Sequence, residues 1–175
     1  MTVIRRLDPA AAERLGDALA RLLEDAVAGG ASLGFLLPLE RAESEAYWRS
    51  VVDAMRAGRR LVLVALADER LVGSVQLDLE TRANGRHRAE VTKLMVLRAH
   101  RRQGVGRELM SAVLAAARCA GRSLLLLDVR VGDPAEALYR SLGFVAVGEV
   151  PRYARSPDGS LAATRFYYLE LVPGT

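Results

Sequence analysis

A short apolar run at residues 123–129, Ser-Leu-Leu-Leu-Leu-Asp-Val, constrains the fold more than any other part of the sequence. Its four consecutive leucines show no alternation of apolar and polar residues. Such a short continuous run is typical of a β-strand that is buried on both faces. A sheet that contains this strand needs helices on both of its faces, so the sequence predicts an α/β fold with a mixed sheet.

The spacing of apolar residues elsewhere predicts the other elements. Asp8 is the expected N-cap of the first helix and Pro9 its first residue. Gly58, Gly121 and Gly143 are expected to end later helices. The Asn84-Gly85 pair predicts a hairpin. The predicted order is β-α-α-β-β-β-α-β-α-β-β, with strands at 2–7, 60–67, 71–80, 89–97, 123–129, 144–150 and 164–171, helices at 9–28, 40–57, 105–120 and 134–142, and a loop at 151–163.

Length and composition favour one cytoplasmic domain over residues 1–175. The chain has 175 residues, a formal net charge of +4 and a single cysteine, Cys119, so no internal disulfide is possible. The N-terminus lacks the apolar core of a signal peptide, and no run approaches the roughly 18 apolar residues of a membrane span. Cys119 follows a helical apolar pattern, which predicts a packing role rather than a nucleophile.

The stretch at residues 100–109, His-Arg-Arg-Gln-Gly-Val-Gly-Arg-Glu-Leu, is the strongest functional signal. It joins a predicted strand to a predicted helix, so unpaired N–H groups and the positive end of the helix dipole converge there. Gly104 and Gly106 let a ligand approach the main chain, and the arginines add charge-assisted hydrogen bonds. The turn is therefore a candidate anion site, although an ordinary solvated turn shares the pattern.

Two other phosphate motifs are excluded. A nucleoside-triphosphate loop requires a lysine followed by serine or threonine after the glycines, and neither dipeptide is present here. A dinucleotide fingerprint requires a third glycine, whereas residue 109 is leucine. A nucleic-acid binder remains a rival, but aromatic residues make up only 5% of the chain and the arginines alternate with acids.

The same stretch resembles the signature [Q/R]-x-x-G-x-[G/A] of the GNAT superfamily of N-acetyltransferases, on Arg101, Gly104 and Gly106. Residues 137–144, Ala-Leu-Tyr-Arg-Ser-Leu-Gly-Phe, resemble a second motif of that family, and the order of elements agrees over essentially the whole chain. Residues 29–36, 84–97 and 147–161 are similar to its tabtoxin-resistance subgroup, which acetylates the amine of a toxin amino acid. The chain departs from the family pattern at Arg98, where proline is frequent, and at Gly132, where asparagine is frequent.

The resemblance implies that the turn holds the diphosphate of acetyl-coenzyme A, as a cosubstrate. The pantetheine arm is expected to pair with the main chain of residues 94–96, and the N–H of Val96 is expected to stabilise the oxyanion. No metal is expected. The residues implied in coenzyme binding are Leu94, Met95, Val96, Arg101, Arg102, Gln103, Gly104, Val105, Gly106 and Arg107.

Three further residues are candidates for the chemistry. The resemblance implies that the hydroxyl of Tyr139 reprotonates the departing thiolate, while a core aromatic is the alternative. Asp128 and Glu90 compete as the base that takes the proton of the amine. Asp128 ends the apolar strand, whereas Glu90 matches a strand position where many family members keep a base. Either carboxylate could instead pair with an arginine.

The expected reaction is direct acetyl transfer to a primary amine of a small molecule. The alternatives are a protein N-terminus or lysine as acceptor, and a noncatalytic acyl-coenzyme A sensor. No nucleic-acid or membrane partner is expected, and the chain is expected to be a monomer or a homodimer. Loop packing is the alternative role for the residues expected to contact the acceptor, which are Ser32, Phe35, Trp48, Tyr153 and Arg155.

Overall fold

The computed structural model describes residues 2–171 and contains seven strands and five α-helices. The elements in chain order are β1 (Thr2–Arg6), α1 (Pro9–Arg14), α2 (Gly16–Ala28), α3 (Arg41–Arg56), β2 (Arg60–Ala67), β3 (Arg70–Leu79), β4 (Arg88–Val96), α4 (Val105–Cys119), β5 (Leu124–Arg130), α5 (Ala135–Ser141), β6 (Val145–Arg155) and β7 (Leu161–Glu170). The two predicted ends of the domain, residues 1 and 175, lie outside the described residues.

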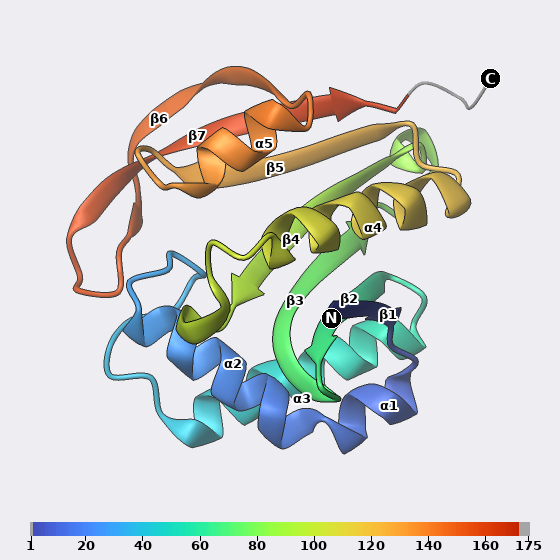
Figure 1. Cartoon of the computed structure of the whole chain (residues 1–175). Helices are drawn as coiled ribbons and strands as arrows, with labels where there is room; N and C mark the ends of the chain where they lie inside the picture. The colour runs from blue at the N-terminus through green and yellow to red at the C-terminus, as the bar shows by residue number, and fades with distance from the viewer. Residues whose placement is uncertain (1, 172–175) are drawn as a thin grey trace.

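One twisted sheet carries all seven strands, in the order β1-β2-β3-β4-β5-β7-β6 (Figure 1). Only β4 and β5 pair in parallel; the other neighbours are antiparallel. Helices α4 and α5 pack on one face in one apolar cluster, and α1, α2 and α3 pack on the other face in a second cluster. The predicted fold class is confirmed. No helix among residues 2–171 combines the length and apolarity needed to cross a bilayer.

The first predicted helix is divided into α1 and α2. Asp8 caps α1 as expected, because its carboxylate accepts the N–H of Ala11 at 2.7 Å. The break falls at Leu15, whose φ of −91° and ψ of 5° leave the helical range. Gly16 then starts the second helix. Apolar spacing continues across the break, so periodicity alone could not reveal it.

The connection between β3 and β4 differs from the predicted tight turn. Asn84 and Gly85 belong to a short 3₁₀ helix inside a longer loop. Gly85 serves close packing here, because a Cβ at this position would lie 2.6 Å from Cγ of Glu80. The two strands still pair antiparallel, so the hairpin itself is confirmed.

The last hairpin is longer than predicted. Residues 151–155, expected in a loop, continue β6, and β7 starts at Leu161. Pro151 is tolerated because β6 is an edge strand and its register with β7 is irregular between Val150 and Ala154. Tyr153 and Arg155 therefore lie on a strand that projects beyond β5 (Figure 1).

A buried carboxylate fastens α5 to the sheet. Glu136 is 6% exposed and accepts hydrogen bonds from the Tyr167 hydroxyl and the Arg165 guanidinium of β7. Its other oxygen accepts the N–H of Gly132 at 2.7 Å. These bonds determine where α5 lies, and with it Tyr139.

We expect Glu136→Ala to lower the free energy of unfolding by about 3 kcal/mol, because the substitution strands a buried tyrosine hydroxyl and a partly buried guanidinium. Urea denaturation measures this change. The matched control is Glu149→Ala, which removes the exposed partner of Arg165. It is expected to cost at most about 1 kcal/mol. Equal losses in the two variants would contradict the role of Glu136.

Candidate active site

Strands β4 and β5 part halfway along their length. Their parallel pairing ends at Glu90 and Leu126, although β4 continues to Val96 and β5 to Arg130. Figure 1 shows the two strands together at one end and spread apart at the other, with the start of α4 near the open end. Backbone groups along the parted segments can pair with a ligand in place of a strand.

The predicted pantetheine strand borders this opening. Leu97 donates its N–H to Val72 at 2.9 Å. Because hydrogen bonding alternates along an antiparallel pair, the N–H and C=O of Val96 point away from β3, toward the side of β5. Met95 is buried and Leu94 half-buried, and both pack in the apolar clusters.

The turn before α4 has the geometry of an anion site. Gly104 has φ +87°, and a Cβ there would meet nothing within 4 Å. The first bond of the helix runs from the N–H of Glu108 to the C=O of Gly104. The N–H groups of residues 105–107 precede it and have no intrahelical acceptor. This cradle fits a diphosphate, since it combines open space, free donors and the positive helix end.

The turn is tied to the C-terminus of α2. Asp25 accepts the N–H of Arg98 at 2.9 Å and its Nε at 2.8 Å. A proline at residue 98, frequent in the family, could not donate this N–H, and the guanidinium of arginine adds the second bond. Gly29 allows the approach, because a Cβ at this position would lie 2.9 Å from Cδ of Arg98.

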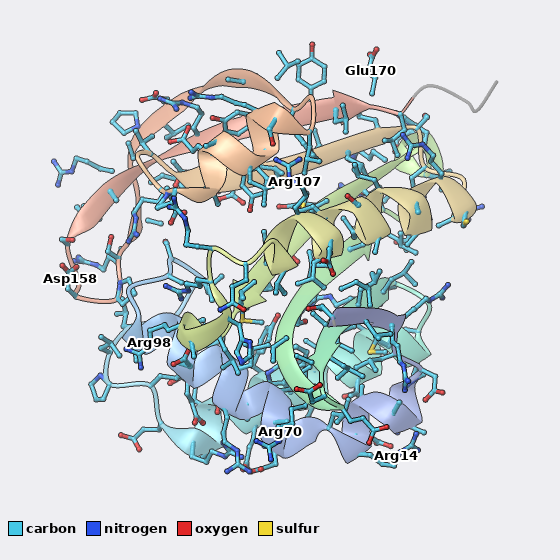
Figure 2. The ribbon with its side chains drawn as sticks, viewed as in Figure 1. Arg14, Arg70, Arg98, Arg107, Asp158 and Glu170 are labelled. Carbon is cyan, nitrogen blue, oxygen red and sulfur yellow. The ribbon has the colours of Figure 1, made fainter. Side chains whose placement is uncertain are left out.

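The arginines of the turn have different surroundings. Nε of Arg101 donates to the C=O of Val96 at 3.2 Å, so this side chain lies along β4. Arg102 is exposed and has φ +64°, in the left-handed region. Arg107 donates to Ser141 of α5 at 2.8 Å, and Figure 2 shows it between α4 and α5. The amide of Gln103 closes the turn onto the C=O of Ala99 at 3.1 Å.

The two candidate bases share one face of the sheet. Glu90 pairs with Leu126, and Asp128 lies two residues farther along β5, so both side chains point to the face that α2 and α3 cover. Both residues are exposed. Burial of their protein-facing side raises the pKa of each carboxyl, and the charge of Asp128 further raises the pKa of Glu90. A carboxyl whose pKa is raised is a better proton acceptor than an ordinary carboxylate, which suits a general base.

Tyr139 combines a core ring with a hydroxyl that has no hydrogen-bond partner among residues 2–171. The residue is 7% exposed, and its ring contacts Phe144 and Tyr167 at centroid distances of 6.0 and 6.4 Å. Burial, with the nearby charges of Asp133 and Asp128, raises the pKa of the hydroxyl, which therefore stays protonated. Both sequence interpretations of this tyrosine, core aromatic and proton donor, are compatible with this position.

Sequence reasoning missed a polar cluster on the same face as the two carboxylates. The Tyr47 hydroxyl donates to Oε1 of Gln76 at 2.9 Å, and Arg60 donates to the same oxygen at 3.1 Å. Burial raises the pKa of Tyr47 to about 12, so its hydroxyl remains a donor. Nζ of Lys93 lies 5.9 Å from the Tyr47 ring centre. One signal was available, because Lys93 is the only lysine in the chain.

Two chain segments meet at the open end of the strands. The loop between α2 and α3, which contains half-buried Ser32, contacts the tip of the β6–β7 hairpin, since Leu37 donates to the C=O of Pro157 at 2.9 Å. In the loop, the ring of Phe35 meets that of Tyr47 edge-on at 5.3 Å. On the hairpin, Tyr153 meets Phe166 at 5.3 Å. Phe35 is thereby brought to the polar cluster.

The other predicted acceptor residues lie apart from this cluster. Arg155 donates to the C=O of Gly159 at 2.8 Å and closes the tip of the hairpin. Trp48 is 3% exposed in the core between the helices, and it borders a separate hollow between α1 and α3. The predicted packing role of Cys119 is wrong, because this residue is exposed at the end of α4.

Comparison with known proteins identifies the family. The model of the acetyltransferase (GNAT) family matches residues 32–144, which include β4, the turn and α5. The chain belongs to this family. An uncharacterised N-acetyltransferase of Azospirillum brasilense is 33% identical over 129 residues, which is 73% of this chain and 74% of that protein.

Solved acetyltransferase structures share the fold. An N-acetyltransferase from Staphylococcus aureus superposes with a TM-score of 0.80 at 15% identity, covering 98% of this chain and 99% of its own. A Salmonella typhimurium protein, described as an acetyltransferase and solved with its cofactor acetyl-CoA, gives a TM-score of 0.78 at 22% identity, over 99% and 96% of the two chains.

We expect Arg102→Ala to weaken acetyl-coenzyme A binding about 10-fold, because it removes one charge-assisted contact from the turn. Calorimetric titration measures the dissociation constant. Arg118→Ala, an exposed substitution at the opposite end of the same helix, should leave it unchanged. A loss of the same size in both variants would mean that only the overall charge matters.

Proposed function

We propose that this GNAT acetyltransferase transfers the acetyl group of acetyl-coenzyme A directly to a primary amine of a small molecule. One observation carries the proposal: the opening between β4 and β5 has the helix start of α4 at its mouth and two carboxylates without an ion pair among residues 2–171. These carboxylates lie on the acceptor face, which is the sheet face that α2 and α3 cover. A pantetheine arm that runs from the turn along β4 would bring the thioester into the opening. An amine beside the carboxylates would lie at the same place.

Each of these residues has a separate role in the reaction. A carboxylate accepts a proton from the acceptor ammonium, and the free amine attacks the thioester carbonyl carbon. The N–C bond forms, the attacking nitrogen loses its second proton to solvent, and the C–S bond breaks, while the N–H of Val96 stabilises the oxyanion. The Tyr139 hydroxyl gives its proton to the thiolate and regains one from solvent.

Asp128 is the better base of the two. It lies beyond the last β4–β5 pair, on the parted segment of β5, whereas Glu90 still belongs to the paired segment. The charge of Asp128 also reaches both Tyr139 and Lys93. A base at this position faces the amine from the side opposite the coenzyme strand.

A small acceptor is favoured by two features. The loop and the hairpin tip meet through Leu37 and Pro157, which narrows access at the open end. The resemblance to the tabtoxin-resistance subgroup supports an amino-acid-like or toxin acceptor. Cytoplasmic location, the lack of nucleic-acid and membrane partners, and a monomeric or homodimeric state stay predictions.

We expect Tyr139→Phe to lower kcat about 10²- to 10⁴-fold while the KM for acetyl-coenzyme A changes little. The phenyl ring keeps its contacts with Phe144 and Tyr167, so the variant should fold normally. Thiol release from acetyl-coenzyme A in the presence of a panel of amines measures the rate. Unchanged turnover would return Tyr139 to a purely structural role.

The pH dependence identifies the base. Because the pKa of each carboxyl is raised, kcat/KM should rise with pH along an acid limb that lies above the ordinary carboxyl range. Asp128→Asn should lower kcat at least about 100-fold. Glu90→Gln, the matched control, should keep most of the activity. The assignment is reversed if Glu90→Gln causes the larger loss.

A further inference from the structure

The side chain of Lys93 owes its position to an irregularity of β4. Gln76 pairs with Thr92 and Ser74 with Met95, so Val75 alone lies opposite both Lys93 and Leu94. This extra residue makes a β-bulge, in which Lys93 has φ +53°. Regular alternation would place Lys93 opposite Val75, on the side of α4. The bulge turns it to the acceptor face instead.

The ammonium group of Lys93 has little direct compensation there. It lies 5.9 Å from the Tyr47 ring centre, and no carboxylate of residues 2–171 lies within 4 Å of it. Burial and the positive charge of Arg60 lower the pKa of Lys93, whereas the charges of Asp128, Asp78 and Glu90 act in the opposite direction from beyond ion-pair distance. A half-buried cation without an ion pair is unfavourable unless something else satisfies it.

Space for such a group is present beside Nζ. Gly34, in the loop after α2, has φ +85°, and a Cβ built there would lie 4.0 Å from Nζ and near no other atom. The loop thus presents no side chain to the ammonium at this point. The edge-on pair of Phe35 and Tyr47 provides an apolar wall next to it.

The neighbouring polar groups add to the surplus of donors. Oε1 of Gln76 accepts from Tyr47 and Arg60, which fixes the orientation of the amide. Nε2 of Gln76 is then buried without an acceptor, as is the hydroxyl of Ser74 on the same strand face. These two groups are enclosed by protein, so they add to the excess of donors around Lys93 without themselves reaching a ligand.

Negative and positive groups lie at different places along the opening. Arg60 is neutralised by Asp78, with Nη2 at 2.7 Å from Oδ2. Among residues 2–171, Asp128 and Glu90 form no ion pair on the side of β5, and Lys93 forms none on the side of the loop after α2. The charge of Asp128 raises the pKa of Glu90. The opening thus offers its ligand carboxylates in one place and an ammonium group in another.

From this arrangement we infer that Lys93 binds an acid group of the acceptor, so that the acceptor is a zwitterionic, amino-acid-like molecule whose amine faces Asp128. The inference rests on the proposed function, since it names the acceptor of the same site. The acid group occupies the space beside Gly34 and the Tyr47 ring. Lys93 is thus a specificity residue that touches the substrate and takes no part in proton transfer.

The competing role for Lys93 is that of a counter-charge for the carboxylates. In that role, loss of the ammonium raises the pKa of Asp128 and Glu90 and shifts the acid limb of the pH profile for every amine alike. In the proposed role, the loss raises KM for acceptors that carry an acid group, and amines without one are spared. The two roles therefore predict different dependence on the acceptor.

The experiment compares the common L-amino acids with their carboxamides, using thiol release from acetyl-coenzyme A. The ratio of kcat/KM for acid and carboxamide is measured in the wild type, in Lys93→Met and in Lys93→Arg. An amino acid and its carboxamide differ in the basicity of the amine, and this difference cancels when the ratio of a variant is compared with the ratio of the wild type. Arg70→Met is the matched control, because Figure 2 shows Arg70 far from Arg107 and the start of α4. Thermal unfolding verifies that each variant folds.

We expect Lys93→Met to lower the acid-to-carboxamide ratio about 10- to 100-fold, the range for one charge-assisted hydrogen bond. Lys93→Arg should restore part of it, and Arg70→Met should leave it unchanged. An equal loss for acids and carboxamides, with a shifted acid limb, would overturn the inference in favour of the counter-charge.

The failures of the two proposals are distinguishable. If the wild type acetylates carboxamides or simple amines but not acids, the proposed function stands and the role of Lys93 is wrong. If it releases no thiol with any amine, the proposed function fails. Calorimetric titration of amino acids into the coenzyme-saturated protein then tests whether Lys93 binds an acid group. Binding that Lys93→Met abolishes supports this role, and an absence of binding overturns it.

Discussion

The parting of β4 from β5 is the constraint on which the rest of the structure depends. Two parallel strands that stop pairing leave backbone donors and acceptors without partners in the middle of a sheet, where water cannot easily replace them. Here the break follows Glu90 and Leu126. A ligand that pairs like a strand satisfies those groups, and it is held between the free helix start of α4 and the carboxylates of the opposite face. One irregularity thus creates both halves of the site.

The parts that surround the opening are held by ion networks outside it. Asp25 and Arg98 tie the turn before α4 to the end of α2, and Glu136 ties α5 to β7. The turn and α5 carry the expected coenzyme contacts and Tyr139, so their placement matters more than their own stability. Charged residues in such networks mainly fix the positions of the elements that they join. They add little net stability, because the cost of their desolvation offsets much of their attraction.

The acceptor face separates its charges. Asp128 and Glu90 lie on the strands next to the opening, whereas Lys93 is turned toward the loop after α2 by the bulge in β4. Arg60 and Asp78 neutralise each other between them. A positive and a negative group that are held apart in this way select for the arrangement of charges on a ligand more than for its size.

Local features were determined by the sequence alone. Asp8 before Pro9, the glycines of the turn and Gly143 act through their own backbone preferences, so the helix starts and stops that they predict agree with the structure. The spacing of apolar residues predicted the order of strands and helices along the chain, because this periodicity also depends only on neighbouring residues. The family motifs indicated the turn and Tyr139, because backbone approach to an anion restricts a short continuous segment.

Only the tertiary structure decided the features that depend on partners distant in sequence. The bulge that turns Lys93 arises from its register with β3, and the extension of β6 past Pro151 is possible only because that strand lies at an edge. The contact between Tyr47 and Gln76 joins a helix to a strand 29 residues away. Periodicity describes which face a residue prefers within one element, whereas register and the packing of separate elements determine what that face meets.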